Sequence, residues 1–473
     1  MSASAHTFAS GPSASASSGA PWAPLRRPPL RGVRVPPHER SRLPGGATLT
    51  IVPRRDVPLV AFCAVVRGGA LGDPAGRCGT AQLTAALLDK GAGARDAFGF
   101  ADAVEGAGGS FNAVALPEYL CVSGQFLARD QALMLELLAA ALLEPHLCDQ
   151  ELGKQRMRHI ELIRSAKDSD PYELLGAYGR AFLFPHHPYG RPAGGEERSL
   201  ASLTRADVLR FHREQVGADR LALVFAGDVD RTALARAVTR AFSGWRAAGA
   251  ALPPVPDPEP PGSRRVRLID APGCAQSYFW LGARGVSRSH PARAALDLAN
   301  TVYGGRFSSM LNAELRVRAG LTYGASSGFN RGRAAGEFAI RGSTPTGSTA
   351  RALELTLGTL ERLKREGISA EQLESARQYV LGQYPLALET AADWVNAFAE
   401  LEAYGLSTEY IEGYADALAA VTLDEAHAAI AAAFPHPDDL QLVIIADAAR
   451  TRARAARYGA VIETALAQPS FSA

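Results

Sequence analysis

Histidine and cysteine are the side chains in this sequence best suited to hold a metal ion. None of the ten histidines forms an H-x-x-E-H, H-E-x-x-H or H-x-x-x-H pattern. Two histidines one turn apart on a helix can bind one zinc ion, so no such helical site is expected. The five cysteines are scattered and form no C-x-x-C pair, which leaves a thiolate zinc site without support. We expect them to be small buried residues in a reducing compartment rather than a disulfide framework.

One nucleophile pattern is present in the second half of the chain. Residues 324–328 have the sequence GASSG, which fits the G-x-S-x-G elbow of serine hydrolases. That elbow needs a strand, a sharp turn and then a helix. Residues 329–342 contain glycines and alternate in polarity, which predicts a hairpin instead. Although His427 and His436 lie downstream, no Asp-to-His order suits a catalytic triad, so we expect no serine hydrolase.

The composition is that of an ordinary globular protein of two or three domains. The chain has 473 residues, of which 47% are hydrophobic and 21% charged. No apolar run reaches the roughly 18–20 residues that a membrane helix needs, so we expect no membrane span. Fifty Lys and Arg against 48 Asp and Glu give a net charge of +2, which argues against nucleic-acid binding.

The sequence contains two copies of one pattern. Arg67 and Arg284 are 217 residues apart, as are Pro74 and Pro291, and the apolar strand RLALVFAGD has its counterpart in DLQLVIIAD near the C-terminus. Matching anchors at a nearly constant offset indicate a duplicated domain. In each copy, strand pairs are interleaved with pairs of helices. This arrangement predicts an α+β protein in which each copy is a two-layer α/β sandwich.

The expected domain boundaries follow from this duplication. The N-terminal domain spans residues 42–246, a stiff linker rich in proline spans 247–264, and the C-terminal domain spans 265–465. Residues 1–41 are expected to be a disordered tail. No apolar core follows its basic residues, so it is no secretory signal, and its prolines would break the helix of a transit peptide. We expect a cytoplasmic protein, with a periplasmic or organellar location as the alternatives.

Several stretches in both halves resemble a known family. They are GGALGDPAGRCGTAQLTAALLDKGA, GGSFNA, FPHHPYGRPAGG, LALVFAGDVD and GGRFSSMLNAELRVRAGLTYGASS. In this order and spacing, the sequence resembles the pitrilysin/insulinase/mitochondrial-processing-peptidase family of zinc peptidases, and among them the non-catalytic subunits. The resemblance implies that both domains have the metallohydrolase fold of that family.

In that family the zinc ligands form an inverted H-x-x-E-H motif on the helix after the first strand pair. In this sequence the two histidine positions are Gln82 and Ala86, and the general-base position is Ala85. A methyl group coordinates nothing, and a lone amide is a poor zinc ligand. The third family ligand is a carboxylate, expected near Glu161, which we interpret as a remnant or a solvated residue. The resemblance therefore implies a degenerate site and no bound zinc in this chain.

Two features that bind substrate in the family are retained. Arg316 and Tyr323 match a family pair that holds the substrate backbone, with Arg316 late in a helix and Tyr323 starting the next strand. Asn112 and Ala113 match residues of an edge strand that pairs with the substrate peptide. An arginine fork and a phenol suit peptide carbonyls and the oxyanion formed during hydrolysis. Edge pairing recognises backbone rather than side chains.

These features lead to two alternatives. The first is a subunit without zinc that supplies half of a substrate chamber and the Arg316/Tyr323 clamp to a sister subunit carrying H-x-x-E-H. Peptides would then be the substrate, and zinc would be expected only in the sister. The second is a structural or assembly protein of the same fold with no role in proteolysis.

Overall fold

The structure is a computed structural model that describes residues 32–252 and 254–472. Most of the predicted N-terminal tail therefore lies outside the described residues. Within the expected tail, Glu39–Arg42 form strand β1, which pairs antiparallel with β2 (Thr48–Pro53). The ordered N-terminal domain thus begins before residue 42. Strand β1 has the sequence ERSR, and all four residues are exposed. Because none of them is apolar, no hydrophobic alternation marks this strand in the sequence.

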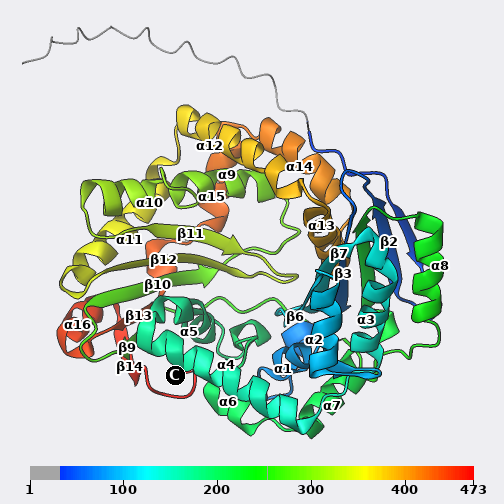
Figure 1. Cartoon of the computed structure of the whole chain (residues 1–473). Coiled ribbons are helices and arrows are strands. Elements are labelled where there is room, and N and C mark those ends of the chain that lie inside the picture. The colour runs from blue at the N-terminus through cyan, green and yellow to red at the C-terminus, as the bar shows by residue number, and fades with distance from the viewer. Residues whose placement is uncertain (1–31, 253, 473) are drawn as a thin grey trace, which may run out of the picture. The chain divides into compact units, whose positions relative to one another are not determined.

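Two six-stranded sheets that share the order of five strands organise residues 32–472 (Figure 1). The first has the order β1-β2-β8-β3-β7-β6 and the second β14-β9-β13-β10-β12-β11. The additional strands are β3 Leu59–Arg67, β6 Ser110–Ala115, β7 Tyr119–Leu127, β8 Leu221–Gly227, β9 Arg265–Asp270, β10 Gln276–Arg284, β11 Ala325–Asn330, β12 Glu337–Pro345, β13 Gln441–Ala446 and β14 Ala460–Ala465. A separate short pair joins β4 Gly91–Ala92 to β5 Arg95–Asp96.

The matching orders confirm the two α/β domains predicted from the duplication. In both sheets one parallel pair, β2 with β8 and β9 with β13, lies beside antiparallel strands, and β6 and β11 occupy equivalent edges. The sixth strands differ, because β1 pairs antiparallel with β2 whereas β14 pairs parallel with β9. Strand β11 continues into β12 as an antiparallel pair, as the glycine-containing stretch 329–342 predicts. No helix follows the G-x-S-x-G segment, so it is no nucleophile elbow.

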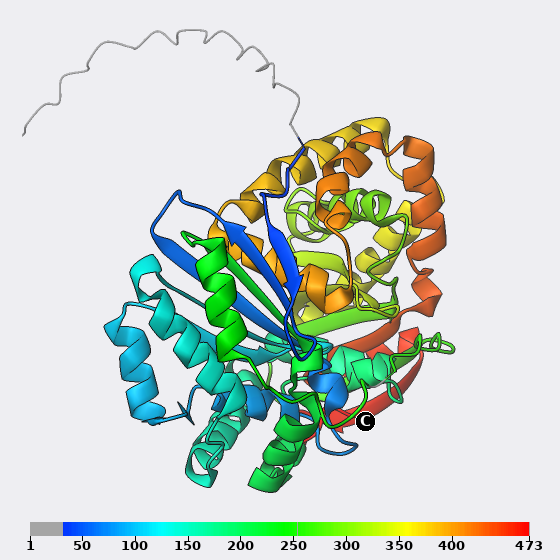
Figure 2. The same ribbon diagram turned by 90° about the vertical axis from the view of Figure 1, so that its right-hand side faces the viewer.

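Each half supplies helices to one face of its own sheet. In the first half these include α2 (Ala97–Gly106), α3 (Gln131–Leu143) and α8 (Arg231–Ala241), which lies across the blue strands in Figure 2. The other helices of this half are α1 Thr80–Leu87, α4 Asp149–Ser169, α5 Leu175–Leu183, α6 Glu197–Ser202 and α7 Arg205–Gln215. The second half contains α9 Arg293–Tyr303, α10 Met310–Asn312, α11 Thr349–Glu366, α12 Ala370–Gln383, α13 Ala391–Tyr404, α14 Glu409–Ala420, α15 Leu423–Ala433 and α16 Ala448–Ala455.

The opposite face of each sheet is covered by a helix from the other half (Figure 1). Helix α13 places Trp394 and Phe398 against apolar residues of β3 and β8. Helix α5 packs on β10 and β13, where Gly179 lies so close to the Trp280 ring that an added Cβ would be 2.4 Å from it. The two halves therefore exchange one helix each and share two apolar cores.

A buried carboxylate joins the two hairpin turns at the centre of this exchange. Glu118, between β6 and β7, accepts hydrogen bonds from the Tyr189 hydroxyl at 2.8 Å and from the backbone N–H of Arg333 at 3.0 Å. Gly332 permits this approach, because a Cβ there would be 2.5 Å from Tyr189 Oη. The turn after β11 is thus held against the turn after β6.

The C-terminal segment returns from the second half to the first. The fully buried guanidinium of Arg267 on β9 donates to the backbone carbonyls of Phe471 and Ser472. The Phe471 ring packs edge-on against Tyr178 of α5, and Glu196 accepts from the Phe471 N–H. This segment adds a third connection between the halves.

The linker lies along the surface as an extended segment. Its described residues 247–252 and 254–264 contain no helix or strand and are mostly exposed. Asp257 accepts a hydrogen bond from the Ala335 N–H at 2.9 Å, and His187 contacts the Pro256 carbonyl at 2.8 Å. Both halves therefore hold the linker in place.

In residues 32–252 and 254–472 no single helix is long and apolar enough to cross a membrane; one bent pair, α14 with residues 423–439, passes by length and composition alone.

Candidate functional site

Helix α1, which carries the three motif positions, is anchored at its N-terminus by a buried aspartate. The Asp73 carboxyl accepts hydrogen bonds from the backbone N–H groups of Gly79 and Ala81, both at 2.7 Å. These N–H groups have no partner within the helix, and the N-cap residue Gly79 has no side chain. The Asp73 carboxyl therefore takes the place of an N-cap side chain. Burial raises the pKa of the Asp73 carboxyl from 3.8 to about 7, against the opposing effects of Ala81, Gly79 and Arg191.

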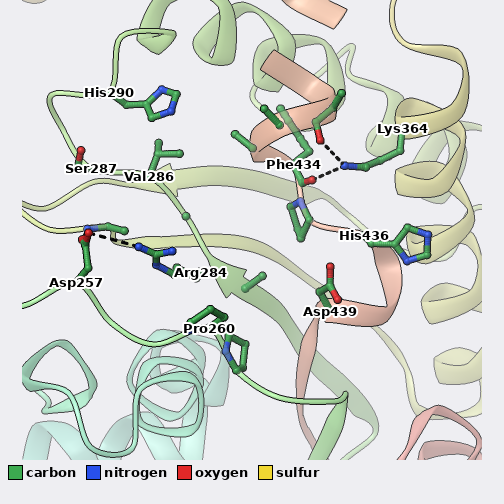
Figure 3. Close-up of a pocket in the computed structure, with 18 residues that line it drawn as sticks. Asp257, Pro260, Arg284, Val286, Ser287, His290, Lys364, Phe434, His436 and Asp439 are labelled. Carbon is green, nitrogen blue, oxygen red and sulfur yellow. Dashed lines mark hydrogen bonds and ion pairs between the residues drawn. The ribbon is translucent and has the colours of Figure 1, made fainter. Parts of the chain in front are cut away.

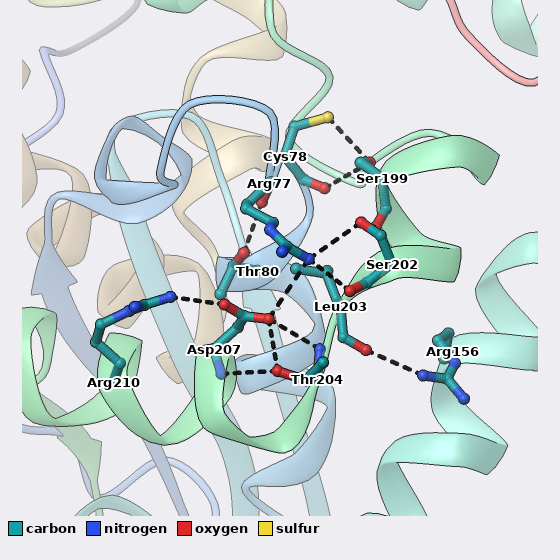
Figure 4. A network of polar contacts seen from close by, with 10 residues as sticks. All are labelled: Arg77, Cys78, Thr80, Arg156, Ser199, Ser202, Leu203, Thr204, Asp207 and Arg210. Carbon is teal, nitrogen blue, oxygen red and sulfur yellow. Dashed lines mark hydrogen bonds and ion pairs between the residues drawn. The ribbon is translucent and has the colours of Figure 1, made fainter.

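A polar network fixes the start of α1 to helices α6 and α7 (Figure 4). Arg77 donates to the Ser202 carbonyl at 2.5 Å and lies 3.6 Å from the Asp207 carboxylate. The hydroxyl of Thr80 donates back to the Arg77 carbonyl at 2.6 Å. Asp207 also completes the capping box of α7 with Thr204. The position of α1 is therefore determined by contacts outside the motif.

The side chain at the first histidine position is engaged at both ends. Gln82 Oε1 accepts from the Ala115 N–H at 3.0 Å, and Gln82 Nε2 lies 3.3 Å from His159 Nε2. His159 Nδ1 contacts the Gln155 carbonyl at 2.8 Å, which makes Nδ1 the protonated nitrogen and leaves Nε2 to accept from Gln82. Gln82 thus connects α1 to α4 and to the edge strand β6.

The other two motif positions are apolar and packed. Ala85 is 0% exposed and belongs to the core of the first half, and Ala86 is half-buried. Among the residues that the structure describes, no group of three His, Cys, Asp or Glu side chains is placed to hold a metal ion. A side-chain amide, two methyl groups and one imidazole do not fit the zinc site of the family.

The residue of α4 that faces the motif is His159, which the sequence analysis did not select. Glu161 is exposed and pairs with Arg164 at 2.9 Å, as expected for a solvated residue. His159 follows Leu152 and Gln155, both buried, at helical spacing. This spacing places His159 on the buried side of α4, so helix periodicity could have identified it.

Strand β6 is the edge of the first sheet and contains Asn112 and Ala113. The Leu116 N–H bonds to the Tyr119 carbonyl across the hairpin, whereas the Ala115 N–H turns outward to Gln82. Because these directions alternate along a strand, the backbone groups of Ala113 also point away from β7. The Asn112 side chain is exposed. An extended peptide could add to this edge beside Gln82.

Arg316 and Tyr323 contact each other on the exposed side of the second half. Arg316 lies in a π-helical segment, Ala313–Arg318, and its Nη1 donates to the Tyr323 backbone carbonyl at 2.6 Å. The guanidinium also lies over the Phe307 ring, 4.6 Å from its centroid. The Tyr323 side chain is 87% exposed. Tyr323 precedes β11 by two residues, so our expectation that it starts the strand is wrong.

Tyr323 lies outside β11 because it belongs to the loop before this strand, which the Asn312 amide holds in place. Asn312 Oδ1 accepts from the Ala325 N–H at 3.0 Å, and its amide donates to the Arg306 carbonyl at 3.3 Å. Pairing with β12 therefore begins only at Ala325. Arg316 and Asn312 together determine where the Tyr323 phenol projects.

A cavity of about 730 Å³ lies elsewhere, between the linker and the second half (Figure 3). Asp257 and Arg284 form an ion pair of 3.5 Å on one side. On the other side, Lys364 donates to the carbonyls of Ala431 and Phe434 at the end of α15. These charged groups already have partners, and none of the predicted site residues lines the cavity.

Comparison with protein families identifies the chain. The family model described as Insulinase (Peptidase family M16) matches residues 54–193, and the model described as Peptidase M16 inactive domain matches residues 202–380. This chain belongs to peptidase family M16. The resemblance derived from the sequence is thereby confirmed; the first model lies within the first half, and the second starts in the first half at residue 202 and extends across the linker into the second half.

The alignments with curated relatives cover most of this chain and most of each relative. An uncharacterized zinc protease of Mycobacterium bovis is 28% identical over 409 residues, which cover 85% of this chain and 92% of the relative. A protein of Helicobacter pylori named non-peptidase homolog YmxG is 25% identical over 338 residues, 70% of this chain and 75% of the relative. Some similar chains are thus named zinc proteases, and at least one is named a non-peptidase homolog.

Solved structures confirm the fold. A peptidase M16 inactive domain protein from Pseudomonas fluorescens has a TM-score of 0.80 at 23% identity and covers 87% of this chain and 98% of its own. A protease from Helicobacter pylori has a TM-score of 0.81 at 19% identity, with 87% and 100% covered.

The buried Asp73 predicts a pH-dependent stability of the folded chain. Between pH 3.8 and about 7 the folded state keeps a proton that the unfolded chain has lost, so the free energy of unfolding falls as pH rises through this window. The slope reaches about 1.4 kcal/mol per pH unit. Urea unfolding of the wild type and of Asp73→Asn at several pH values measures it. In Asp73→Asn the free energy of unfolding should no longer fall with pH in this window. Asp102→Asn, a control at an exposed site, should show the same fall as the wild type. Equal slopes for the wild type and Asp73→Asn would contradict the assignment.

Restoring the motif by Gln82→His, Ala85→Glu and Ala86→His should not produce an efficient peptidase. The new carboxylate at position 85 would replace a methyl group with 0% exposure, and the loss of the amide frees the Ala115 N–H. His159 supplies a nitrogen rather than the family carboxylate. Zinc content and peptide turnover of the triple variant test this, with His159→Ala added as a control that should weaken zinc binding. Turnover equal to that of an intact family member would show a more complete site.

Proposed function

We propose that this chain is the subunit without zinc of a two-chain M16 peptidase. Its partner would be a sister subunit that carries H-x-x-E-H and binds the zinc ion. This chain would supply half of the substrate chamber, the edge strand β6 and the Arg316/Tyr323 clamp. The substrate would be a peptide in an extended conformation. A cytoplasmic location stays a prediction from the sequence.

The observation that carries the proposal is an exposed clamp in a chain whose motif helix has no zinc ligands. Tyr323 is 87% exposed although a phenol of this size is normally at least partly packed, and Phe307, whose ring lies under the Arg316 guanidinium, is 64% exposed. No ion pair of Arg316 with a carboxylate is found within residues 32–252 and 254–472. Two exposed aromatic side chains and a cation without an acidic partner favour contact with another molecule.

The division of labour is chemically coherent. Peptide hydrolysis needs a Lewis acid and a base at the scissile bond, and separately needs donors aimed at the backbone and the developing oxyanion. Arg316 and Tyr323 can provide hydrogen-bond donors but neither metal ligands of the family type nor a carboxylate base. Gln82, Ala85 and Ala86 can provide neither the metal ligands nor the base. The chain is therefore suited to the second task and not to the first.

The second candidate is a structural or assembly role without proteolysis. One observation favours it: the Arg316 guanidinium donates to the chain's own Tyr323 carbonyl and stacks on its own Phe307. In this alternative, the two contacts hold the loop at residues 319–324 in place and have no further role. The two candidates differ in whether changes at the clamp alter peptide cleavage.

Replacement of the clamp should lower peptide cleavage by the assembled pair. Co-expression with an H-x-x-E-H sister, purification by a tag on this chain and a peptide assay measure the effect. Tyr323→Phe removes a donor and should lower kcat by roughly 10²–10³-fold. Arg316→Ala removes both the loop contact and a possible substrate contact, so part of its loss should appear in KM.

Matched control variants come from the same region. Arg318→Ala removes a neighbouring arginine that pairs with Glu314, and Tyr379→Phe removes the hydroxyl of a partly exposed tyrosine on α12. Both should cleave at the wild-type rate. Unfolding midpoints and co-purification should be unchanged in all four variants. Clamp variants with wild-type kcat and KM would favour the structural role.

A further inference from the structure

Two of the five cysteines face each other on neighbouring strands. Cys63 of β3 and Cys121 of β7 point to the same face of the first sheet, and their Sγ atoms are 2.8 Å apart. This distance is longer than the roughly 2.05 Å of a disulfide bond, so the two sulfurs are unbonded, and it is shorter than an ordinary contact between two sulfur atoms. All five cysteines are free, and Cys78, Cys148 and Cys274 lie outside this pair. The sequence, in which these two are 58 residues apart, gives no sign of the pair.

The pair lies in the core shared by the two halves. Cys63 is 1% exposed and packs with apolar residues of α13, whereas Cys121 is half-buried at the margin of the same cluster. The ring of Tyr119, two residues before Cys121, packs edge-on against Tyr404 of α13 at 6.1 Å. Of the two residues, Cys121 is therefore the more accessible to a reagent from solvent.

The hydrogen bonding distinguishes the two thiols. The contact with Cys121 and burial raise the pKa of the Cys63 thiol well above its ordinary value. The contact with Cys63, supported by Ser123, lowers the pKa of the Cys121 thiol despite burial. Cys121 is thus the better nucleophile by both access and thiolate character.

We propose that Cys63 and Cys121 form a thiol–disulfide exchange site for small disulfides of the glutathione type. Cys121 loses its proton and attacks one sulfur of the reagent R–S–S–R, forming a mixed disulfide and releasing one R–SH. Cys63 then loses its proton and attacks Cys121 Sγ, which forms the Cys63–Cys121 bond and releases a second R–SH. The two protein thiols lose two electrons and two protons, and the reagent disulfide gains them.

The strand register makes this bond reversible. Cys63 is paired directly with Ser123, and Cys121 with Val65, so the two cysteines are diagonal neighbours. Diagonal residues have Cα atoms roughly 7–8 Å apart, beyond the usual 4.4–6.8 Å of a disulfide. Closing the bond requires β3 and β7 to shift slightly against each other, and a strained disulfide is readily reduced by thiols.

The full-length reduced chain tests this proposal without any partner subunit. It is incubated with oxidised glutathione, and remaining thiols are blocked before peptide mapping by mass spectrometry. We expect a disulfide between the peptides that contain Cys63 and Cys121, and its loss after addition of dithiothreitol. Cys63→Ala should instead accumulate glutathione on Cys121, because the resolving thiol is missing. Cys274→Ala, at another half-buried cysteine, should behave as the wild type.

Two results would overturn the proposal. One is glutathione accumulating on Cys121 in the wild type to the same extent as in Cys63→Ala. The other is recovery of both thiols unmodified after incubation. If Cys63→Ala does not fold, Cys121→Ala gives the second test: Cys63 should then stay unmodified, since it is buried, and modification of Cys63 would contradict the order of attack. None of these outcomes depends on the proposed peptidase role.

Discussion

Each sheet of this chain has two apolar faces, and its own half supplies helices for only one of them. The exchange of α5 and α13 between the halves resolves this constraint. Buried side chains such as Trp394 and Phe398 each contribute roughly 2–3 kcal/mol through apolar burial. Separation of the halves would expose these faces to water. The relative position of α1 and the Arg316 loop therefore depends on packing far from either.

The same arrangement leaves the edges β6 and β11 as the equivalent open sides of the two sheets. At β6 the chain places Gln82, whose amide satisfies the Ala115 N–H and meets His159. Near β11 it places the exposed phenol of Tyr323. The first half thus offers a backbone edge without metal ligands, and the second offers hydrogen-bond donors. The proposed role in a two-chain peptidase combines these properties with a metal site from elsewhere.

Local patterns predicted the elements that carry the candidate site. Glycines and alternating polarity over residues 329–342 predicted the β11–β12 hairpin, and the repeated anchors predicted two equivalent domains. The motif positions Gln82, Ala85 and Ala86 followed from the resemblance alone. Strand β1 could not be predicted because its residues are polar and exposed, and its pairing depends on β2 and on Arg40 bound to Glu402 of α13.

Contacts between distant segments were the part that the sequence could not provide. Helix amphipathicity does not say which sheet α13 covers, and the contact of Gln82 with His159 requires the packing of α1 on α4. The pairing of Cys63 with Cys121 depends on strand register, and the loop position of Tyr323 depends on the amide of Asn312. The spacing of these residues along the chain follows no helix or strand period, so it does not predict that they meet.

The zinc content of the chain tests the central claim most directly. The chain is expressed without a sister subunit, purified without added metal and analysed for zinc by elemental analysis. An amide and two methyl groups at the motif positions predict a zinc content close to zero per chain, unchanged by Gln82→Ala. About one tightly held zinc ion per chain, lost on replacement of His159, would contradict the account.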